Sequence, residues 1–248
     1  MLRLGQVGFS QRVRLEWLDK TAYLVMAGND RAAVNAALQA MLSDKLSVGG
    51  HGKGGSRDKT MVILRKTWLT VPKELVCLRD EGLQLLARLP RERHLVVHWG
   101  MVMAVYPFWA GIAAIVGRLL RLQGSVAAAH VQRRAREQYG ERETVSRAVR
   151  RILRSFHDWG VLQETGEKGV YAAGAVIAVE EPGLIAWLTE AALHSRATDS
   201  ALLKEVLGSP TLFPLRLATI PAQSLGAPSP RLDILRQGLD EDVVVLQR

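Results

Sequence analysis

The chain has very little cysteine, because Cys77 is the only one among 248 residues. A single thiol forms no internal disulfide, so the sequence excludes a disulfide-stapled domain and favours a reducing compartment. Cys77 lies in a leucine-rich segment, which predicts a small buried side chain rather than a nucleophile. The N-terminus lacks the apolar stretch of a secretory signal. We therefore expect a cytoplasmic protein.

Acidic residues are too few to balance the basic ones. The chain has 33 Lys and Arg against 24 Asp and Glu, which gives a formal net charge of +9. This charge favours a polyanionic partner: nucleic acid, an anionic membrane surface or an acidic protein. Most of the basic residues are arginine, which suits bidentate contacts to phosphate and guanine.

Convincing catalytic and metal-ligand patterns are also lacking. The sequence contains no Gly-x-Ser-x-Gly motif and no convincing pair of nuclease carboxylates. His94 and His98 stand four residues apart, but no glutamate lies between them and spacing identifies no third ligand. We expect two core or subunit-contact histidines, no metal, no cofactor and no enzymatic activity.

The glycine-rich residues 48–60 resemble a phosphate-binding loop only in composition. A P-loop reads G-x-x-x-x-G-K-[ST] after a strand. Here Ser47 replaces the first glycine, Gly54 replaces the hydroxyl residue after Lys53, and the preceding segment is helical in pattern. We predict a mobile connector that contacts a phosphate backbone through its basic residues Lys53, Arg57 and Lys59.

The uncharged residues 95–117 form a run long enough to cross a bilayer. Pro107 interrupts the run, His98 lies inside it, and Gly100 and Gly111 weaken a continuous helix. Arginines flank both ends, so the positive-inside asymmetry of a membrane span is missing. We predict two buried helices that meet at Pro107 rather than a membrane span.

The N-terminal part is helical in pattern. Three short helices are expected over residues 13–27, 31–42 and 56–68. Gly28 is a natural stop, while Asp30 and Ser56 are natural N-terminal caps. The arrangement fits a helix-turn-helix variant and equally an ordinary small bundle. A further helix is expected over residues 72–88, closed by Pro90.

Residues 125–172 carry the most informative pattern. Ser125 and Thr144 are expected to cap two helices that stop at Gly140 and Gly160. A hairpin over residues 161–164 and 170–172 follows the second helix. With a further helix in front, this order is typical of a winged helix-turn-helix.

The second of these helices separates apolar and basic residues onto opposite faces. At about 100° per residue, its apolar face contains Val145, Val149, Ile152 and Phe156, and its basic face contains Arg147, Arg150, Arg151 and Arg154. A solvated face usually mixes charge signs, and no acid is expected on this one. We predict a DNA-binding face, with further contacts from Thr144, Ser146, Arg133, Arg134 and, at the hairpin tip, Lys168.

The expected fold is mainly α. Residues 1–90 are predicted to form an N-terminal helical, helix-turn-helix-like module. Residues 91–178 are predicted to form the apolar helical pair and a central winged helix-turn-helix. Residues 179–248 are predicted to form a small α/β C-terminal appendix with helices over 181–194 and 201–207 and a terminal hairpin.

The first half of the chain resembles the BrxA family, which are small accessory proteins of BREX phage-defence systems. The resemblance rests on the helical hairpin after Phe9, on the Ser-Arg-Asp-Lys-Thr sequence of residues 56–60 and on the Pro-Lys-Glu-Leu sequence of residues 72–75. It implies a non-enzymatic DNA-binding protein with helix-turn-helix elements. The chain departs from the family by a longer C-terminal part and a stronger winged-helix pattern.

Together these patterns predict a non-catalytic protein that binds double-stranded DNA, as a subunit of a bacterial phage-defence assembly. Other proteins of that system are expected partners, a homo-oligomer is a further expectation, and a membrane is not an expected partner. Two alternatives stay open. One is a winged-helix transcriptional regulator, which would read two half-sites as a dimer. The other is a protein-interaction subunit with a purely structural winged helix.

Overall fold

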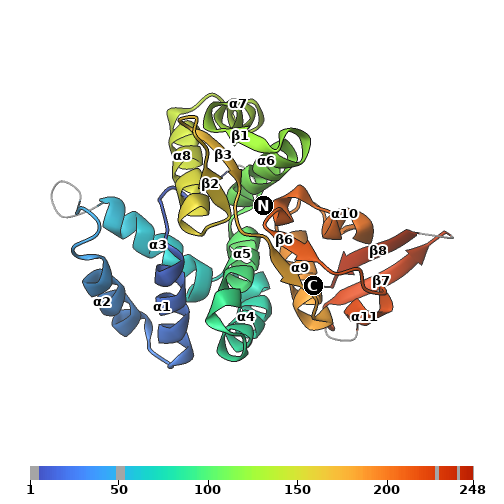
Figure 1. Cartoon of the computed structure of the whole chain (residues 1–248). Helices are drawn as coiled ribbons and strands as arrows, with labels where there is room; N and C mark the ends of the chain where they lie inside the picture. The colour runs from blue at the N-terminus through green and yellow to red at the C-terminus, as the bar shows by residue number, and fades with distance from the viewer. Residues whose placement is uncertain (1–5, 49–53, 227–228, 239–240, 248) are drawn as a thin grey trace.

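The computed structural model describes residues 6–48, 54–226, 229–238 and 241–247. Its described part is mainly helical with small sheets, as expected. Figure 1 shows α1–α3 on one side, α6–α8 with their sheet at the top, the C-terminal strands on the other side, and α5 between them. One cluster of buried apolar side chains runs through all these parts.

The three N-terminal helices form where they were predicted: α1 (Leu15–Met26), α2 (Arg31–Leu42) and α3 (Ser56–Trp68). Gly28 has a φ of 73°, which explains the stop after α1. The Asp30 side chain accepts a hydrogen bond from the Ala33 N–H at 2.8 Å and caps α2. The cap predicted at Ser56 is wrong, because Gly55 is the N-cap of α3 and Ser56 is already helical.

A second group of helices forms the centre: η3 (Lys73–Leu75), α4 (Val76–Arg88), η4 (Arg91–Arg93), α5 (His94–Val105) and α6 (Pro107–Gln123). All residues of α5 are buried. The prediction that Cys77 is buried is wrong. The buried face of α4 is formed by Leu78, Gly82, Leu85 and Leu86, and the Cys77 thiol is exposed away from it.

The two apolar helices meet at Tyr106 and Pro107, as predicted. Among the described residues no single helix is both long and apolar enough to cross a membrane. Taken together, Arg91–Val105 and Pro107–Gln123 have the length and apolar composition of a membrane span, but the two helices are bent by 119° relative to each other. Pro107 lacks the N–H that would continue α5, so it begins α6 instead.

The glycines of these helices are positions of close contact. A Cβ on Gly100 would stand 2.3 Å from the Trp187 ring of α9 (Pro182–His194), and a Cβ on Gly117 would stand 2.1 Å from the Pro210 carbonyl oxygen. Because contacts this short are not tolerated by real side chains, glycine is what lets α9 and η5 (Pro210–Leu212) approach the apolar pair.

After α6 the chain forms β1 (Ser125–Ala127), α7 (Ala128–Tyr139), α8 (Glu143–Asp158), β2 (Leu162–Glu164) and β3 (Val170–Ala173). The strands make an antiparallel sheet in the order β1-β3-β2. Two predicted caps are wrong. Ser125 lies in β1, whose Val126 is buried and pairs with Tyr171, and Thr144 lies inside α8, which begins at Glu143.

The C-terminal part adds two small sheets around α9. A parallel pair joins β4 (Ile177–Val179) to β6 (Leu215–Leu217). The terminal hairpin, predicted over residues 232–234 and 243–246, is confirmed. Its strands are longer than predicted and form β7 (Leu232–Gln237) and β8 (Glu241–Leu246). The helix predicted over residues 201–207 is helical only as α10 (Leu203–Leu207). The residues before it form β5 (Ser200–Leu202), which pairs with β8. The short α11 (Gln223–Gly226) precedes the hairpin.

Candidate nucleic-acid interface

The apolar face of α8 is buried as predicted. Val145, Val149, Ile152 and Phe156 are all 0% exposed. Phe156 packs against Trp99 and Trp109 of the apolar helical pair, with ring centroids 5.1 and 5.2 Å apart. The opposite face of α8 is thereby fixed toward the outside of the molecule.

Arg147, Arg150 and Arg154 are exposed on that opposite face. The expectation that no acid accompanies them is wrong. The Glu143 carboxylate lies 3.5 Å from the Arg147 Nε and accepts a hydrogen bond of 3.0 Å from the Arg150 guanidinium. These groups are more than half exposed, so water screens the pairing and it contributes little to stability. The face keeps three positive charges against one negative charge.

Arg151 is tied to the fold, unlike its neighbours on α8. It is half-buried, and its guanidinium donates a hydrogen bond to the Ser10 carbonyl oxygen at 2.5 Å. Burial, followed by the positive charges of the neighbouring arginines, lowers the pKa of Arg151 below its ordinary value. The like-charge repulsion expected from the sequence is therefore present, and Arg151 is already occupied by a backbone partner.

The partner of Arg151 belongs to an N-terminal segment, residues 9–13, that lies along α8. The Val13 N–H donates to the Ser155 Oγ at 2.9 Å, and the Trp159 indole N–H donates to the Val13 carbonyl oxygen at 2.9 Å. Arg12 pairs with Asp158 at the end of α8. No sequence pattern indicates this contact, because it joins residues more than 140 positions apart.

The two hydroxyl residues at the start of α8 differ in access. Thr144 is exposed in the first turn, where backbone N–H groups lack helical partners. Ser146 is only 8% exposed, which leaves little of its side chain accessible for the predicted phosphate contact. It lies on the flank of the apolar face, about 100° from Val145 along the helix, and faces the interior.

Three predicted basic residues flank α8 on neighbouring elements. On α7, Arg133 is exposed with its Nε 3.8 Å from the Glu137 carboxylate, and Arg134 is exposed. Lys168 is exposed at the turn between β2 and β3, beside Gly169 with its φ of 78°. Apart from the residues of the glycine-rich connector, the residues predicted as contacts therefore lie on α7, on α8 and at the tip of one hairpin.

The glycine-rich connector offers fewer exposed basic side chains than expected. Lys59 is exposed, but Arg57 is half-buried and donates hydrogen bonds to the carbonyl oxygens of Ser43 and Leu46, at 2.7 and 3.2 Å. Arg57 therefore holds the end of α2 against the start of α3. Lys53 lies outside the described residues. Of the described connector residues predicted to contact phosphate, Lys59 is the one whose side chain is exposed.

A separate polar cluster lies inside the molecule. His94 and His98 are 2% and 0% exposed, which confirms them as core residues. Their Nδ1 and Nε2 atoms lie 2.7 and 2.9 Å from one oxygen of Asp19, which is itself 6% exposed. Burial raises the pKa of Asp19, but hydrogen bonds from His98 and His94 and their charges outweigh it, and the net shift is downward. Sequence spacing missed Asp19, although a charged residue beside the apolar Leu18 and Ala22 was a usable signal.

Comparison with known proteins adds no precedent for this interface. No protein-family model, no curated protein and no solved structure matches the chain. The resemblance to the BrxA family therefore stays a prediction.

Proposed function

We propose that residues 107–173 form a winged helix that binds double-stranded DNA without catalysis. The order α6, β1, α7, α8, β2, β3 supports this reading, because it places a strand before the two successive helices and a hairpin after them. The strand β1 completes a three-stranded sheet with that hairpin. In this arrangement α8 corresponds to the recognition helix and the turn containing Lys168 to the wing.

The observation that carries the proposal is the exposed triad Arg147, Arg150 and Arg154 on α8. None of the three donates a hydrogen bond to a backbone carbonyl in the described structure, in contrast to Arg151. Among the residues that the structure describes, the exposed Glu143 is the one acid paired with them. Phosphates across this face would relieve the repulsion, and the major groove of B-DNA, about 12 Å wide, admits a helix of this kind.

The position of each arginine along α8 suggests its role. Arg147 and Arg150 lie in the part nearer the N-terminus, which enters the groove in helix-turn-helix proteins, so they are assigned to base edges. Arg154 lies nearer the C-terminus and is assigned to the phosphate backbone. Thr144, Arg134 and Lys168 surround α8 and are assigned to flanking phosphates.

A charge-matched comparison tests the proposal. One variant replaces Arg147, Arg150 and Arg154 with alanine. The control replaces three exposed arginines of other elements, Arg31, Arg88 and Arg216, with alanine and changes the net charge equally. Fluorescence anisotropy with a random duplex at about 50–100 mM salt measures the dissociation constant of each protein. We expect the α8 variant to bind at least about tenfold more weakly than the control variant.

Equal binding by the α8 variant and the control would contradict the proposal. It would favour the alternative in which this region is a protein-contact module. The packing of residues 9–13 along α8 supports that alternative, because it shows that this helix already binds a segment of polypeptide. A dimer in solution with a preference for two-fold symmetric sites would instead favour a transcriptional regulator. Membership of a cytoplasmic bacterial defence assembly rests on the BrxA resemblance and belongs to the same proposal.

A further inference from the structure

We propose that Asp19, His94 and His98 bind one divalent transition-metal ion, with Zn²⁺ as the best-fitting ion. One ligand atom from each residue lies within 4.8 Å of the others, and all three residues are buried. Two imidazoles and one carboxylate are a common ligand set for zinc, which also accepts a water in a fourth position. This site lies apart from the candidate DNA interface on α8 and does not depend on it.

The elements that supply the ligands hold them in place. His94 and His98 are one turn apart on α5, so both rings project from the same side of a helix that is buried along its whole length. Asp19 comes from α1, which packs against α5. A metal ion here would link the N-terminal helices to the centre of the molecule.

The hydrogen bonds of His94 match those of a metal ligand. Its Nε2 lies 3.2 Å from the Leu89 carbonyl oxygen, which only accepts, so Nε2 carries a proton. Metal-ligating histidines usually donate their second ring N–H to such a carbonyl, which leaves the other nitrogen directed at the metal. In His94 that other nitrogen is Nδ1, the atom directed at Asp19.

The contacts of His94 leave its Nδ1 free for a metal. The Nδ1 is directed at the Asp19 carboxylate and the Nε2 at the Leu89 carbonyl oxygen. A divalent ion between Nδ1 and the carboxylate would bring two positive charges to Asp19. The Nδ1 of His98 has no hydrogen-bond partner among the described residues. In a zinc complex through Nε2 this Nδ1 would carry the ring proton, so His98 lacks the carbonyl partner that His94 has.

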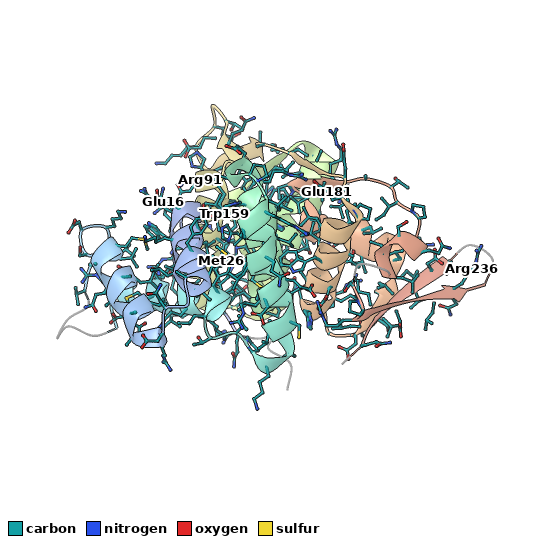
Figure 2. All side chains as sticks on the ribbon, turned by 90° about the horizontal axis from the view of Figure 1, so that it is seen from below. Glu16, Met26, Arg91, Trp159, Glu181 and Arg236 are labelled. Carbon is teal, nitrogen blue, oxygen red and sulfur yellow. The ribbon has the colours of Figure 1, made fainter. Side chains whose placement is uncertain are left out.

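The space needed by the ion is small. Ligand atoms around a tetrahedral zinc, with bonds of about 2.0–2.1 Å, stand roughly 3.3 Å apart. The present separations of 2.7 and 2.9 Å from the Asp19 oxygen therefore grow by roughly half an ångström. The Nε of Arg91, whose side chain is 75% exposed, lies 3.9 Å from the second Asp19 oxygen. Figure 2 labels Arg91, together with Glu16 and Met26, which lie near the two ends of α1.

The test is metal binding by the full chain after treatment with a chelator. Calorimetric titration with Zn²⁺ should give one ion per chain, and Co²⁺ should give the visible absorption of a four-coordinate site. His98→Gln and Asp19→Asn should each weaken Zn²⁺ binding by about 100-fold or more. Substitution of a residue that only hydrogen-bonds to a metal ligand typically weakens binding by about 10–100-fold. The control variants His130→Gln and His157→Gln remove exposed imidazoles and should bind like the parent protein.

X-ray absorption of the zinc-loaded parent protein makes the test independent of how the buried variants fold. We expect two imidazole nitrogens and oxygen ligands around the ion. Absence of stoichiometric binding by the parent protein would overturn the proposal. So would a spectrum without imidazole ligands, or unchanged affinity in folded His98→Gln.

Discussion

At the scale of single residues, four arginines on one face of α8 have two different environments: three are exposed, and one is hydrogen-bonded to the backbone. The sequence places Arg147, Arg150, Arg151 and Arg154 on one face, and helical periodicity is enough to predict this. Helical periodicity does not predict that the Arg151 guanidinium donates a hydrogen bond to the Ser10 carbonyl oxygen, because that contact depends on the path of a distant segment. The candidate site on α8 therefore contains three available arginines rather than the four that the sequence pattern indicates.

This difference makes a prediction for stability. Arg151→Ala should lower the free energy of unfolding by about 1–2 kcal/mol, because it removes a charge-assisted hydrogen bond to the backbone. Arg154→Ala should change it by less than about 0.5 kcal/mol, since Arg154 is exposed. Urea denaturation of the two variants measures both values. Equal destabilisation by the two substitutions would show that the hydrogen bond to Ser10 is not used in solution.

A second residue-scale prediction concerns Glu190, which is 1% exposed. Burial acts to raise its pKa, but the interaction with His194, whose Nε2 lies 3.7 Å away, and the hydrogen bonds and charge of Arg231 outweigh it, so the pKa lies below the ordinary 4.5. A carboxylate whose pKa is lowered by folding stabilises the protein above its unfolded pKa. That stabilisation is lost as the pH falls through the lowered value.

Glu190→Gln should therefore destabilise the protein at pH 7 by about 2–3 kcal/mol, because Arg231 keeps only Glu81 as its ionic partner. The difference from the parent protein should shrink as the pH falls below 4.5, the ordinary value. Thermal unfolding between neutral and acidic pH measures this. A difference that stays constant on acidification would show that Glu190 is not a stabilising carboxylate.

At the scale of elements, the long and strongly patterned segments are the predictable ones. The two apolar helices that meet at Pro107 follow from one proline in an uncharged run, and the apolar face of α8 follows from periodicity. The strand β1 does not follow. It has three residues, and its partner β3 lies more than 40 positions later, so pairing rather than local preference decides its conformation. The predicted cap at Ser125 failed for that reason.

The packing of α5 against α9 gives a prediction at this scale. Gly100→Ala should destabilise the protein by about 1–3 kcal/mol, because the new methyl group meets the Trp187 ring at 2.3 Å. The ring cannot turn away freely, since its N–H donates to the Leu78 carbonyl oxygen at 2.9 Å. Gly166→Ala, with open space around its Cβ, is the matched control and should be close to neutral. Denaturant midpoints compare the two, and an unaffected Gly100→Ala would contradict this packing.

At the scale of the whole molecule, contacts between distant segments decide what the local patterns leave open. Residues 9–13 lie along α8, Asp19 of α1 meets two histidines of α5, and Arg231 joins α9 to α4. None of these follows from spacing, because each depends on how complete elements pack. The first of them also connects the candidate DNA-binding region to the N-terminal segment.

The salt dependence of DNA binding tests the central claim most directly. For the parent protein, the logarithm of the binding constant should fall steeply with the logarithm of the salt concentration, because binding to phosphates releases counterions. In the variant without Arg147, Arg150 and Arg154 the slope should be shallower by about 0.9 for each phosphate that the protein no longer neutralises, at most about 2.7. The charge-matched variant at Arg31, Arg88 and Arg216 should keep the parent slope. Identical slopes for all three folded proteins would contradict the assignment of α8 as the DNA-binding helix.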